Sequence, residues 1–326
     1  MPAIDPPTSL AVVVPAYNEG VGLRDFHARL AAVLDSLDLA CSVLYVDDGS
    51  RDDTWAVMCA LRAADGRVAT LRLSRNFGKE LALTAGLDHV DADAAVVIDA
   101  DLQDPPELIP RFVEHWRAGC DVVYGTRATR AGETGFKKMT AAVFYRVMGR
   151  LSSTPIPRDT GDFRLLSRRA LEALRQVRER QRFMKGLFTW VGFRQQAVVY
   201  NRDPRHAGQS KWNYWRLWNF AIEGITSFST APLRIATYVG ILAALAAFLF
   251  GLWVLGKALW FGDPVPGYPS LMVVVLFLGG IQLMALGIIG EYLGRLYMEA
   301  KQRPLYLIDE YHGGADPADQ TGSGSS

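Results

Sequence analysis

The sequence predicts an α/β protein with a doubly wound, mostly parallel sheet and flanking helices, followed by two membrane-spanning helices. Over residues 10–98, short apolar runs alternate with segments whose apolar residues recur at helical spacing. Strands that alternate with helices are typical of parallel βαβ units. Near the carboxyl end, two long apolar stretches each reach the length that a bilayer crossing requires.

Four apolar runs are predicted to be strands: Leu10–Pro15, Ser42–Val46, Val68–Leu73 and Ala94–Ile98. The segments between them are predicted to be helices, at Arg24–Leu37, around Trp55, Met58 and Leu61, and at Lys79–Val90. A further strand is expected at Asp121–Arg127.

Polar side chains follow three of these strands, at the point where each strand ends. They are Tyr17-Asn18-Glu19, Asp47-Asp48-Gly49-Ser50 and Asp99-Ala100-Asp101. Because ligands bind beyond the carboxyl ends of parallel strands, these residues are predicted to lie along one edge and to form a site. The sequence has neither the Gly-x-Gly-x-x-Gly of a dehydrogenase-type dinucleotide site after the first strand nor a P-loop.

Asp99 and Asp101 are suited to hold one hard divalent cation, Mg²⁺ or Mn²⁺, between them. Such cations prefer oxygen ligands and commonly take one or two carboxylates together with substrate phosphates. A pair of this kind also occurs at ordinary solvated strand ends, so its position at the fourth strand, with LQDPPE behind it, is what favours a metal site.

Composition excludes several classes of protein. A net charge of +1 gives no broad basic field for nucleic acid. The three cysteines, Cys41, Cys59 and Cys120, are far apart, which argues against a disulfide framework or structural zinc and fits a reducing compartment. The segment MPAIDPPTSL has neither a basic start nor an apolar core, so no signal peptide is predicted there.

The two apolar stretches run from Ile235 to Phe261, with Lys257 as the only charge, and from Leu271 to Gly290. A pair of buried core helices is the alternative, but neither stretch has a polar face to meet water. Basic residues flank the pair at Arg234 and at Arg295, whereas the loop 262–270 has none. The positive-inside rule therefore predicts a protein of the plasma (inner) membrane with both termini cytoplasmic.

The domain organisation follows from these segments. We expect a cytosolic catalytic domain at 1–210 and a juxtamembrane amphipathic region at 211–233, where Trp212, Trp215 and Trp218 suit a helix in the headgroup layer. The alternative for that region is a packed core helix. The two spans occupy 234–300, and 301–326 is a cytosolic tail whose polar, small-residue end is predicted to be disordered.

Longer stretches of the sequence resemble a known family. VVVPAYNEG, VDDGSRDDT and DADLQDPPE resemble the family 2 glycosyltransferases of the GT-A fold, a Rossmann-like sheet with flanking helices. NFGKELALTAGL, DVVYGTR and PIPRDTGDFRLLSRRAL are similar to the polyprenyl-phosphate sugar transferases, the group of bactoprenol glucosyltransferases and dolichyl-phosphate mannose synthases. The resemblance runs from about Val12 through the second apolar stretch.

This resemblance implies roles at matching positions. For the donor, Pro15, Tyr17 and Glu19 are expected to line the nucleoside, Asp48 to contact the base, and Asp99, Asp101 and Gln103 to hold the metal and diphosphate. Arg127, Arg205 and Lys211 match basic residues that approach the phosphates, consistent with the phosphate chemistry of guanidinium and ammonium groups. Asp47 either contacts the donor or caps its turn, and Lys79 either reaches a phosphate or faces solvent.

Asp159, Asp162 and Arg164 are expected to position the acceptor or sugar. Mannose synthases have Ser-Gly-Phe-Arg at this segment, with glycine at the position of Asp162. Asp162 agrees instead with the bacterial branch. Catalytic-base work is the alternative role for Asp159 and Asp162. It is disfavoured because a phosphomonoester, whose second pKa is about 6, is already largely dianionic at neutral pH. Arg164 either holds the lipid phosphate or pairs with one of these aspartates.

The resemblance implies inverting transfer of one sugar from a nucleotide-sugar donor to polyprenyl phosphate at the cytoplasmic membrane face. DTGDFR favours UDP-glucose over N-acetylhexosamine, GDP-mannose and aminoarabinose donors. One alternative is a processive polysaccharide synthase, although the sequence has no Gln-x-x-Arg-Trp. The other is a non-catalytic, membrane-tethered nucleotide-sugar sensor. The oligomeric state stays open, a homo-oligomer included.

Overall fold

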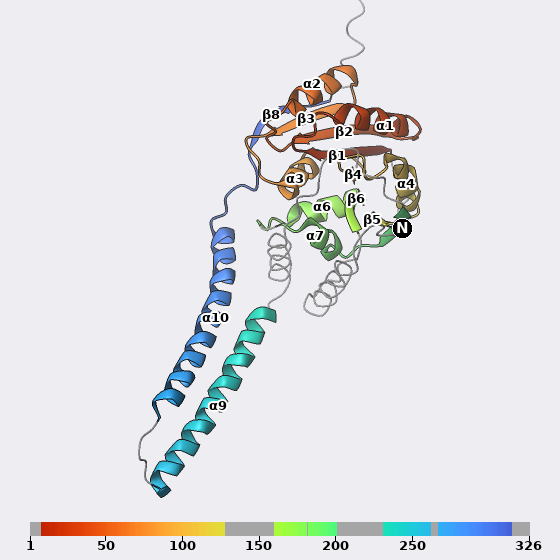
Figure 1. Cartoon of the computed structure of the whole chain (residues 1–326). Coiled ribbons are helices and arrows are strands. Elements are labelled where there is room, and N and C mark those ends of the chain that lie inside the picture. The colour runs from red at the N-terminus through yellow and green to blue at the C-terminus, as the bar shows by residue number, and fades with distance from the viewer. Residues whose placement is uncertain (1–7, 128–159, 181, 201–230, 262–266, 315–326) are drawn as a thin grey trace, which may run out of the picture. The chain divides into compact units, whose positions relative to one another are not determined.

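The computed structural model describes residues 8–127, 160–180, 182–200, 231–261 and 267–314 (Figure 1). These residues form two compact units. One contains a mixed sheet with its helices and includes the segment that begins at Arg303, and the other contains two long helices.

The sheet has eight strands in the order β7-β5-β6-β4-β1-β2-β3-β8. The strands, in chain order, are β1 Ser9–Ala16, β2 Ala40–Asp47, β3 Val68–Leu73, β4 Ala94–Val97, β5 Val122–Arg127, β6 Thr160–Ser167, β7 Gln195–Tyr200 and β8 Ile308–His312. β1 to β4 are mutually parallel, β6 is antiparallel to both β4 and β5, and β8 is antiparallel to β3. The predicted α/β fold is confirmed, with a mixed sheet.

Helices cover both faces of the sheet (Figure 1). One core contains Val12 and Val14 of β1 together with Phe26 and Met58, and is covered by α1 Leu23–Asp35, α2 Thr54–Ala64 and α4 Ile109–Arg117. The opposite face is covered by α3 Lys79–His89 and α6 Arg168–Gln176; the short helices η1 Pro106–Leu108 and α7 Met184–Trp190 complete the unit. Burial on both faces explains why β1 is apolar throughout.

A glycine sets how closely α3 approaches the sheet. A Cβ on Gly86 would lie 2.3 Å from Cγ1 of Val13 and 3.0 Å from Cγ2 of Val46, so a larger residue would push the helix away. α3 begins at the carboxyl edge of the strands, directly after Gly78, whose φ of 100° is accessible to glycine at little cost. The packing therefore presents the first residue of α3, Lys79, at the edge where a site is predicted.

β8 was not predicted from the sequence, which placed 301–326 outside the catalytic domain as a tail. The strand pairs with β3, and its surroundings hold it through side chains as well. The Tyr306 hydroxyl donates to Asp88 Oδ2 at 2.9 Å, Arg62 Nε donates to the Gly313 carbonyl at 2.9 Å, and the His312 ring stacks on Trp55.

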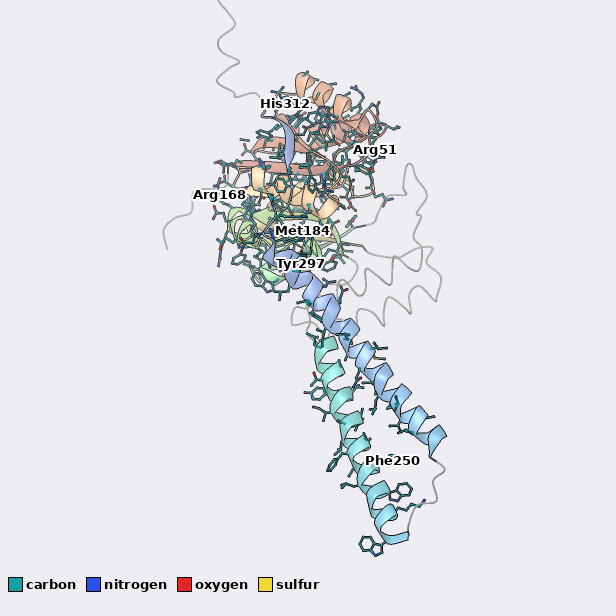
Figure 2. The ribbon with its side chains drawn as sticks, turned by 90° about the vertical axis from the view of Figure 1, so that its left-hand side faces the viewer. Arg51, Arg168, Met184, Phe250, Tyr297 and His312 are labelled. Atoms are coloured by element: carbon teal, nitrogen blue, oxygen red, sulfur yellow. The ribbon has the colours of Figure 1, made fainter. Side chains whose placement is uncertain are left out.

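The second unit consists of α9 Ala231–Phe261 and α10 Tyr268–Ala300, which contact each other. Windows at 236–253 and 273–300 have mean hydropathies of 1.9 and 2.4 and are not buried. Their side chains, Phe250 and Tyr297 among them, project outward from the helices (Figure 2). Both helices are thus long and apolar enough to cross a membrane. Of the predicted juxtamembrane region, 211–233, residues 211–230 lie outside the described residues, and 231–233 belong to α9.

Candidate active site

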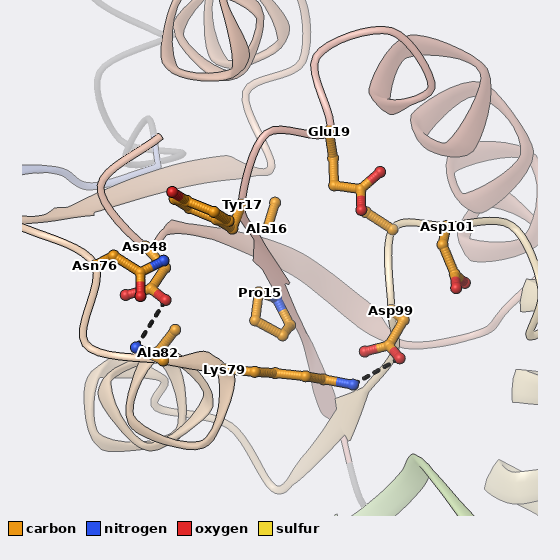
Figure 3. Close-up of a pocket in the computed structure, with 12 residues that line it drawn as sticks. Pro15, Ala16, Tyr17, Glu19, Asp48, Asn76, Lys79, Ala82, Asp99 and Asp101 are labelled. Atoms are coloured by element: carbon orange, nitrogen blue, oxygen red, sulfur yellow. Dashed lines mark hydrogen bonds and ion pairs between the residues drawn. The ribbon is translucent and has the colours of Figure 1, made fainter. Parts of the chain in front are cut away.

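A cavity of about 430 Å³ opens at the carboxyl edge of β1 to β4 (Figure 3). It lies where the strand order reverses around β1 and β4, the usual ligand position in open α/β sheets. Its lining comes from the end of β1 and from the segments that follow the four parallel strands: Pro15, Ala16, Tyr17, Glu19, Asp48, Asn76, Gly78, Lys79, Ala82, Asp99, Ala100 and Asp101.

The loops after β1 and β2 are tied together and form one wall of this cavity. Asn18, at a φ of 55°, donates its main-chain N–H to Ser50 Oγ at 3.0 Å and accepts from the Arg51 N–H at 2.9 Å. The Glu19 N–H donates to Thr54 Oγ1 at 2.9 Å. These bonds fix the segment that carries the predicted nucleoside contacts Pro15, Tyr17 and Glu19, all of which line the cavity.

Asp47 and Asp48 have different environments although they are adjacent. Asp47 is fully buried outside the cavity lining, where it accepts from the Ser50 N–H at 2.9 Å and pairs with Arg72 at 3.4 Å. Asp48 lines the cavity and accepts from the main-chain N–H groups of Phe77 and Gly78, at 2.7 and 2.9 Å. Asp47 therefore stabilises its own turn, whereas Asp48 joins the end of β2 to the start of α3.

The central feature of the site is an ion-pair bridge between Lys79, Asp99 and Asp162. Lys79 Nζ lies 2.7 Å from Asp99 Oδ2 and 2.6 Å from Asp162 Oδ2; Figure 3 shows the contact with Asp99. The two carboxylates come from different strands: β6 is antiparallel to β4 with Val97 opposite Arg164, so two residues further on Asp99 lies close to Asp162. The bridge thus depends on the pairing of β4 with β6.

Charge and burial perturb all three groups. Burial alone would lower the pKa of Lys79, but its two carboxylate partners raise it above the usual range. Burial would raise the pKa of Asp162, yet Lys79, followed by Lys185 and Arg164, lowers it to about 2. Burial raises the pKa of Asp99, with Lys79 opposing the shift. The ammonium and the Asp162 carboxylate are therefore charged at neutral pH.

The residues predicted to hold a metal fit a hard cation. Asp99 Oδ1 and Gln103 Oε1 are buried and have no hydrogen-bond partner, and such oxygens are the ligands that Mg²⁺ and Mn²⁺ prefer. The Gln103 N–H donates to Asp101 Oδ1 at 3.1 Å, through a turn in which Leu102 has a φ of 59°. Within the described segments no three His, Cys, Asp or Glu side chains form a metal site by themselves.

Arg164 lies outside the cavity lining. It is 4% exposed, donates to the Gly161 carbonyl at 2.9 Å, and lies with its guanidinium 3.8 Å from the centre of the Phe188 ring. Burial lowers its pKa to about 10, against the influence of Asp162 and Glu80. Its hydrogen bonds position the start of β6, and thereby Asp162.

Two charged residues near this cluster were not identified from the sequence. Glu80 follows Lys79 on α3 and accepts from the Met184 N–H at 3.3 Å; burial, followed by the Asp162 charge, raises its pKa to about 7. Lys185 on α7 contributes positive charge near Asp162 and Glu80. Glu80 lies within α3 and Lys185 within α7, and neither belongs to the polar clusters that directly follow the parallel strands, so the strand-end pattern does not indicate them.

Asp159, Arg205 and Lys211 lie outside the described residues. Arg127 is placed only as the last residue of β5, the strand between β6 and β7.

The chain belongs to glycosyl transferase family 2. The model of that family matches residues 11–175, and a model described as the GtrB C-terminal hairpin matches residues 231–296, which include most of α9 and α10. The protein is therefore a glycosyltransferase, as the strand-end motifs predicted.

Particular relatives are similar over nearly the whole chain. An uncharacterized glycosyltransferase of Synechocystis is 50% identical over 93% of this chain and 96% of its own length. A prophage-derived bactoprenol glucosyl transferase of Shigella flexneri is 46% identical over 94% of this chain and 99% of its own. Among solved structures, a glucosyl-3-phosphoglycerate synthase of Mycobacterium tuberculosis aligns at 20% identity over 67% of this chain and 76% of its own, with a TM-score of 0.47.

Proposed function

We propose that the protein transfers a single sugar, with inversion, from a nucleotide-sugar donor to a polyprenyl phosphate at the cytoplasmic face of the plasma (inner) membrane. UDP-glucose is the favoured donor and undecaprenyl phosphate the favoured acceptor. The observation that carries the proposal is the cavity at the carboxyl edge of β1 to β4, where Asp99, Asp101 and Lys79 meet. Relatives that are 45–46% identical over almost their full length bear the name bactoprenol glucosyl transferase, which supports this acceptor and sugar.

The donor would occupy this cavity. Pro15, Tyr17 and Glu19 would contact the nucleoside, and Asp48 would bound the base side. Tyr17 is 40% exposed and offers its ring to a planar base. Lys79 would reach the diphosphate from the start of α3. Asp47 is not part of this proposal, because its carboxylate is engaged in its own turn.

Asp99, Asp101 and Gln103 are the residues that would hold a Mg²⁺ or Mn²⁺ ion. When bound there, the ion would neutralise charge on the diphosphate, with the phosphate oxygens completing its ligand set. The unpartnered oxygens of Asp99 and Gln103 support this assignment.

The reaction we infer is an in-line displacement. An oxygen of the lipid phosphate forms a bond to the anomeric carbon, and the bond from that carbon to the diphosphate breaks, with its electron pair leaving on the diphosphate oxygen. The acceptor needs no general base, because a phosphomonoester is largely dianionic at neutral pH. Asp159 and Asp162 would position the acceptor or sugar, with Arg164 holding Asp162 in place. Arg127, Arg205 and Lys211 would stabilise the departing charge.

The remaining proposals concern the membrane. α9 and α10 would span the bilayer, with residues 211–233 at its surface and both termini in the cytoplasm, in accord with the basic residues that flank the pair. The catalytic domain would comprise 1–210 together with β8. A homo-oligomer stays a prediction.

To test the proposal, the purified full chain is incubated with undecaprenyl phosphate and one donor at a time. The donors are UDP-glucose, a UDP-N-acetylhexosamine, GDP-mannose and UDP-aminoarabinose. Mass spectrometry of the lipid fraction is expected to show one added hexose with UDP-glucose, and far less of this product with an Asp101→Asn variant over the same time. A ladder of longer products would indicate a processive synthase. Absence of any lipid product with every donor would contradict the proposal.

A further inference from the structure

We propose that Lys79 is a built-in counter-ion that takes the cation position beside Asp99 until ligands bind, and that it gives up Asp99 when a divalent cation and the donor diphosphate bind together. The inference rests on the proposed function, since it concerns the same cavity. It adds a competition between a side chain and the cation, and a reason why the cation and the donor depend on each other.

The contacts of Asp99 carry the first step. One of its oxygens, Oδ2, lies 2.7 Å from Lys79 Nζ, and the other, Oδ1, is buried with no hydrogen-bond partner. A divalent cation held by Asp99 would be a second positive charge at the same carboxylate. Because like charges at such separations repel strongly in a partly buried site, full occupancy by both is disfavoured.

The contacts of Lys79 carry the second step. Its side chain is 45% exposed, whereas those of Asp99 and Asp162 are only 22% and 12% exposed. Lysine has a flexible four-carbon stem that allows its ammonium to change partners, and Lys79 lines the cavity where the diphosphate would lie. Lys79 can therefore move from Asp99 to a phosphate oxygen, while the buried aspartates stay in place.

Asp162 gives the bridge its second anchor. Asp162 Oδ2 contacts the same ammonium as Asp99 Oδ2, and Asp162 Oδ1 is buried without a hydrogen-bond partner. Asp162 can therefore retain the ammonium when Asp99 is released, and Lys79 occupies Asp99 until an anion arrives that takes the ammonium over. A diphosphate supplies that anion and also ligands for the metal.

Metal and donor must then bind cooperatively. A donor that draws Lys79 away from Asp99 makes room for the cation, and by thermodynamic linkage the cation must strengthen donor binding by the same factor. If Lys79 instead stayed on Asp99 at all times, replacing Lys79 would leave the strengthening of metal binding by the donor unchanged.

This inference is tested by measuring Mn²⁺ binding to the purified full chain, with and without UDP. Electron paramagnetic resonance reports the concentration of free Mn²⁺. In the wild-type protein UDP is expected to tighten Mn²⁺ binding. In Lys79→Met, Mn²⁺ alone is expected to bind at least about tenfold more tightly than in wild type, because one unit charge at contact distance is removed. The enhancement by UDP is expected to shrink correspondingly.

Lys185→Met is the matched control, since it removes a lysine charge that acts on Asp162 and Glu80, whereas the ammonium that contacts Asp99 belongs to Lys79. It is expected to change Mn²⁺ affinity by no more than about twofold. Should Lys79→Met fail to fold, Lys79→Gln serves the same purpose, with thermal unfolding of each variant measured alongside.

The outcomes separate this inference from the proposed function. Unchanged or weaker Mn²⁺ binding in Lys79→Met and Lys79→Gln, with normal UDP-dependent binding in wild type, overturns the role of Lys79 and leaves the proposed function standing. Equal tightening in Lys185→Met also overturns it, because the effect would then come from any nearby charge. Failure of wild type to bind Mn²⁺, with or without UDP, overturns the counter-ion role and the metal assignment together, while the donor panel tests sugar transfer independently.

Discussion

The two edges of the sheet use aspartate in opposite ways. At the amino edge, before β4, Asp93 Oδ2 accepts hydrogen bonds from the main chain and hydroxyls of Thr8 and Ser9, at 2.9–3.1 Å. Nearby, Asp65 is paired with Arg67 at 2.8 Å, and Asp88 with Arg178 at 2.6 Å. These carboxylates have their partners within the protein.

At the carboxyl edge, Asp99 and Asp162 share one ammonium, and each keeps a buried oxygen with no hydrogen-bond partner. Buried polar atoms are normally satisfied, so the under-satisfied oxygens of Asp99 and Asp162 support the proposal that this cavity takes a ligand. The difference teaches that the aspartates described at the amino edge stabilise the fold, whereas the carboxyl edge combines such a residue, Asp47, with two carboxylates that keep unpartnered oxygens.

The largest expected effect is on activity at the carboxyl edge. Asp101→Asn is expected to lower kcat by a factor of about 10²–10³ or more, because a preorganised charge beside the diphosphate is lost. The midpoint of thermal unfolding should stay close to that of wild type. Initial rates with UDP-glucose and differential scanning fluorimetry of the same preparation measure the two quantities. Retention of full activity would remove Asp101 from the site.

The second effect is on stability at the amino edge. Asp93→Ala is expected to reduce the free energy of unfolding by about 1–3 kcal/mol, because the N–H and hydroxyl donors of Thr8 and Ser9 lose their acceptor. Activity per folded molecule should be unchanged. Urea denaturation, together with rates normalised to folded protein, measures both. A loss of activity without a loss of stability in Asp93→Ala would contradict the purely structural role of the amino edge.

The two edges are also expected to respond oppositely to pH. Hydrogen bonding, with the Thr8 N–H as its largest cause, lowers the pKa of Asp93, so its stabilisation is present above the ordinary aspartate pKa and is lost as pH falls through the lowered value. Burial raises the pKa of Glu80 from 4.5 to about 7, so its contribution is fully present below 4.5 and is lost as pH rises through about 7.

Denaturation midpoints measured across this range test the contrast. Glu80→Gln is expected to flatten the decline in stability between about pH 4.5 and about pH 7. Asp93→Asn is expected to flatten the decline on acidification. Identical pH profiles for wild type and Glu80→Gln would show that Glu80 titrates normally.

The smallest effect is expected at Tyr306. Tyr306→Phe removes one hydrogen bond to Asp88 at the amino edge, while Arg178 keeps that carboxylate paired. The free energy of unfolding should fall by about 0.5–1.5 kcal/mol with no change in kcat. A change in kcat without a change in stability would show that the contacts of β8 reach the site.

The parallel part of the fold was predictable because its strands are buried on both faces. β1 and β4 are almost wholly apolar, and the buried residues of α1 and α2 recur at helical spacing. β8 has the sequence IDEYH, in which half-exposed polar residues at an edge strand give no such signal. Its pairing with β3 depends on residues more than 200 positions away.

In the candidate site, too, the residues that follow parallel strands were predictable, and those that depend on other pairings were not. Asp48, Asp99 and Asp101 follow parallel strands, so one topological rule brings them together. Asp47 differs from Asp48 because successive residues of a strand point to opposite faces, and the sequence could not tell which of the two faced the cavity. The bridge from Lys79 to Asp162 depends on the antiparallel pairing of β4 and β6, which no local pattern encodes.

One consequence of β8 concerns synthesis of the chain. The strand that completes the sheet beside β3 is encoded after both long apolar helices. During translation, the edge of β3 therefore stays unpaired until residues 308–312 leave the ribosome, which happens only after α9 and α10 have been synthesised. The helices α9 and α10 are thus inserted in the sequence between two parts of the unit that contains the sheet, and the last strand of the sheet to be synthesised is β8.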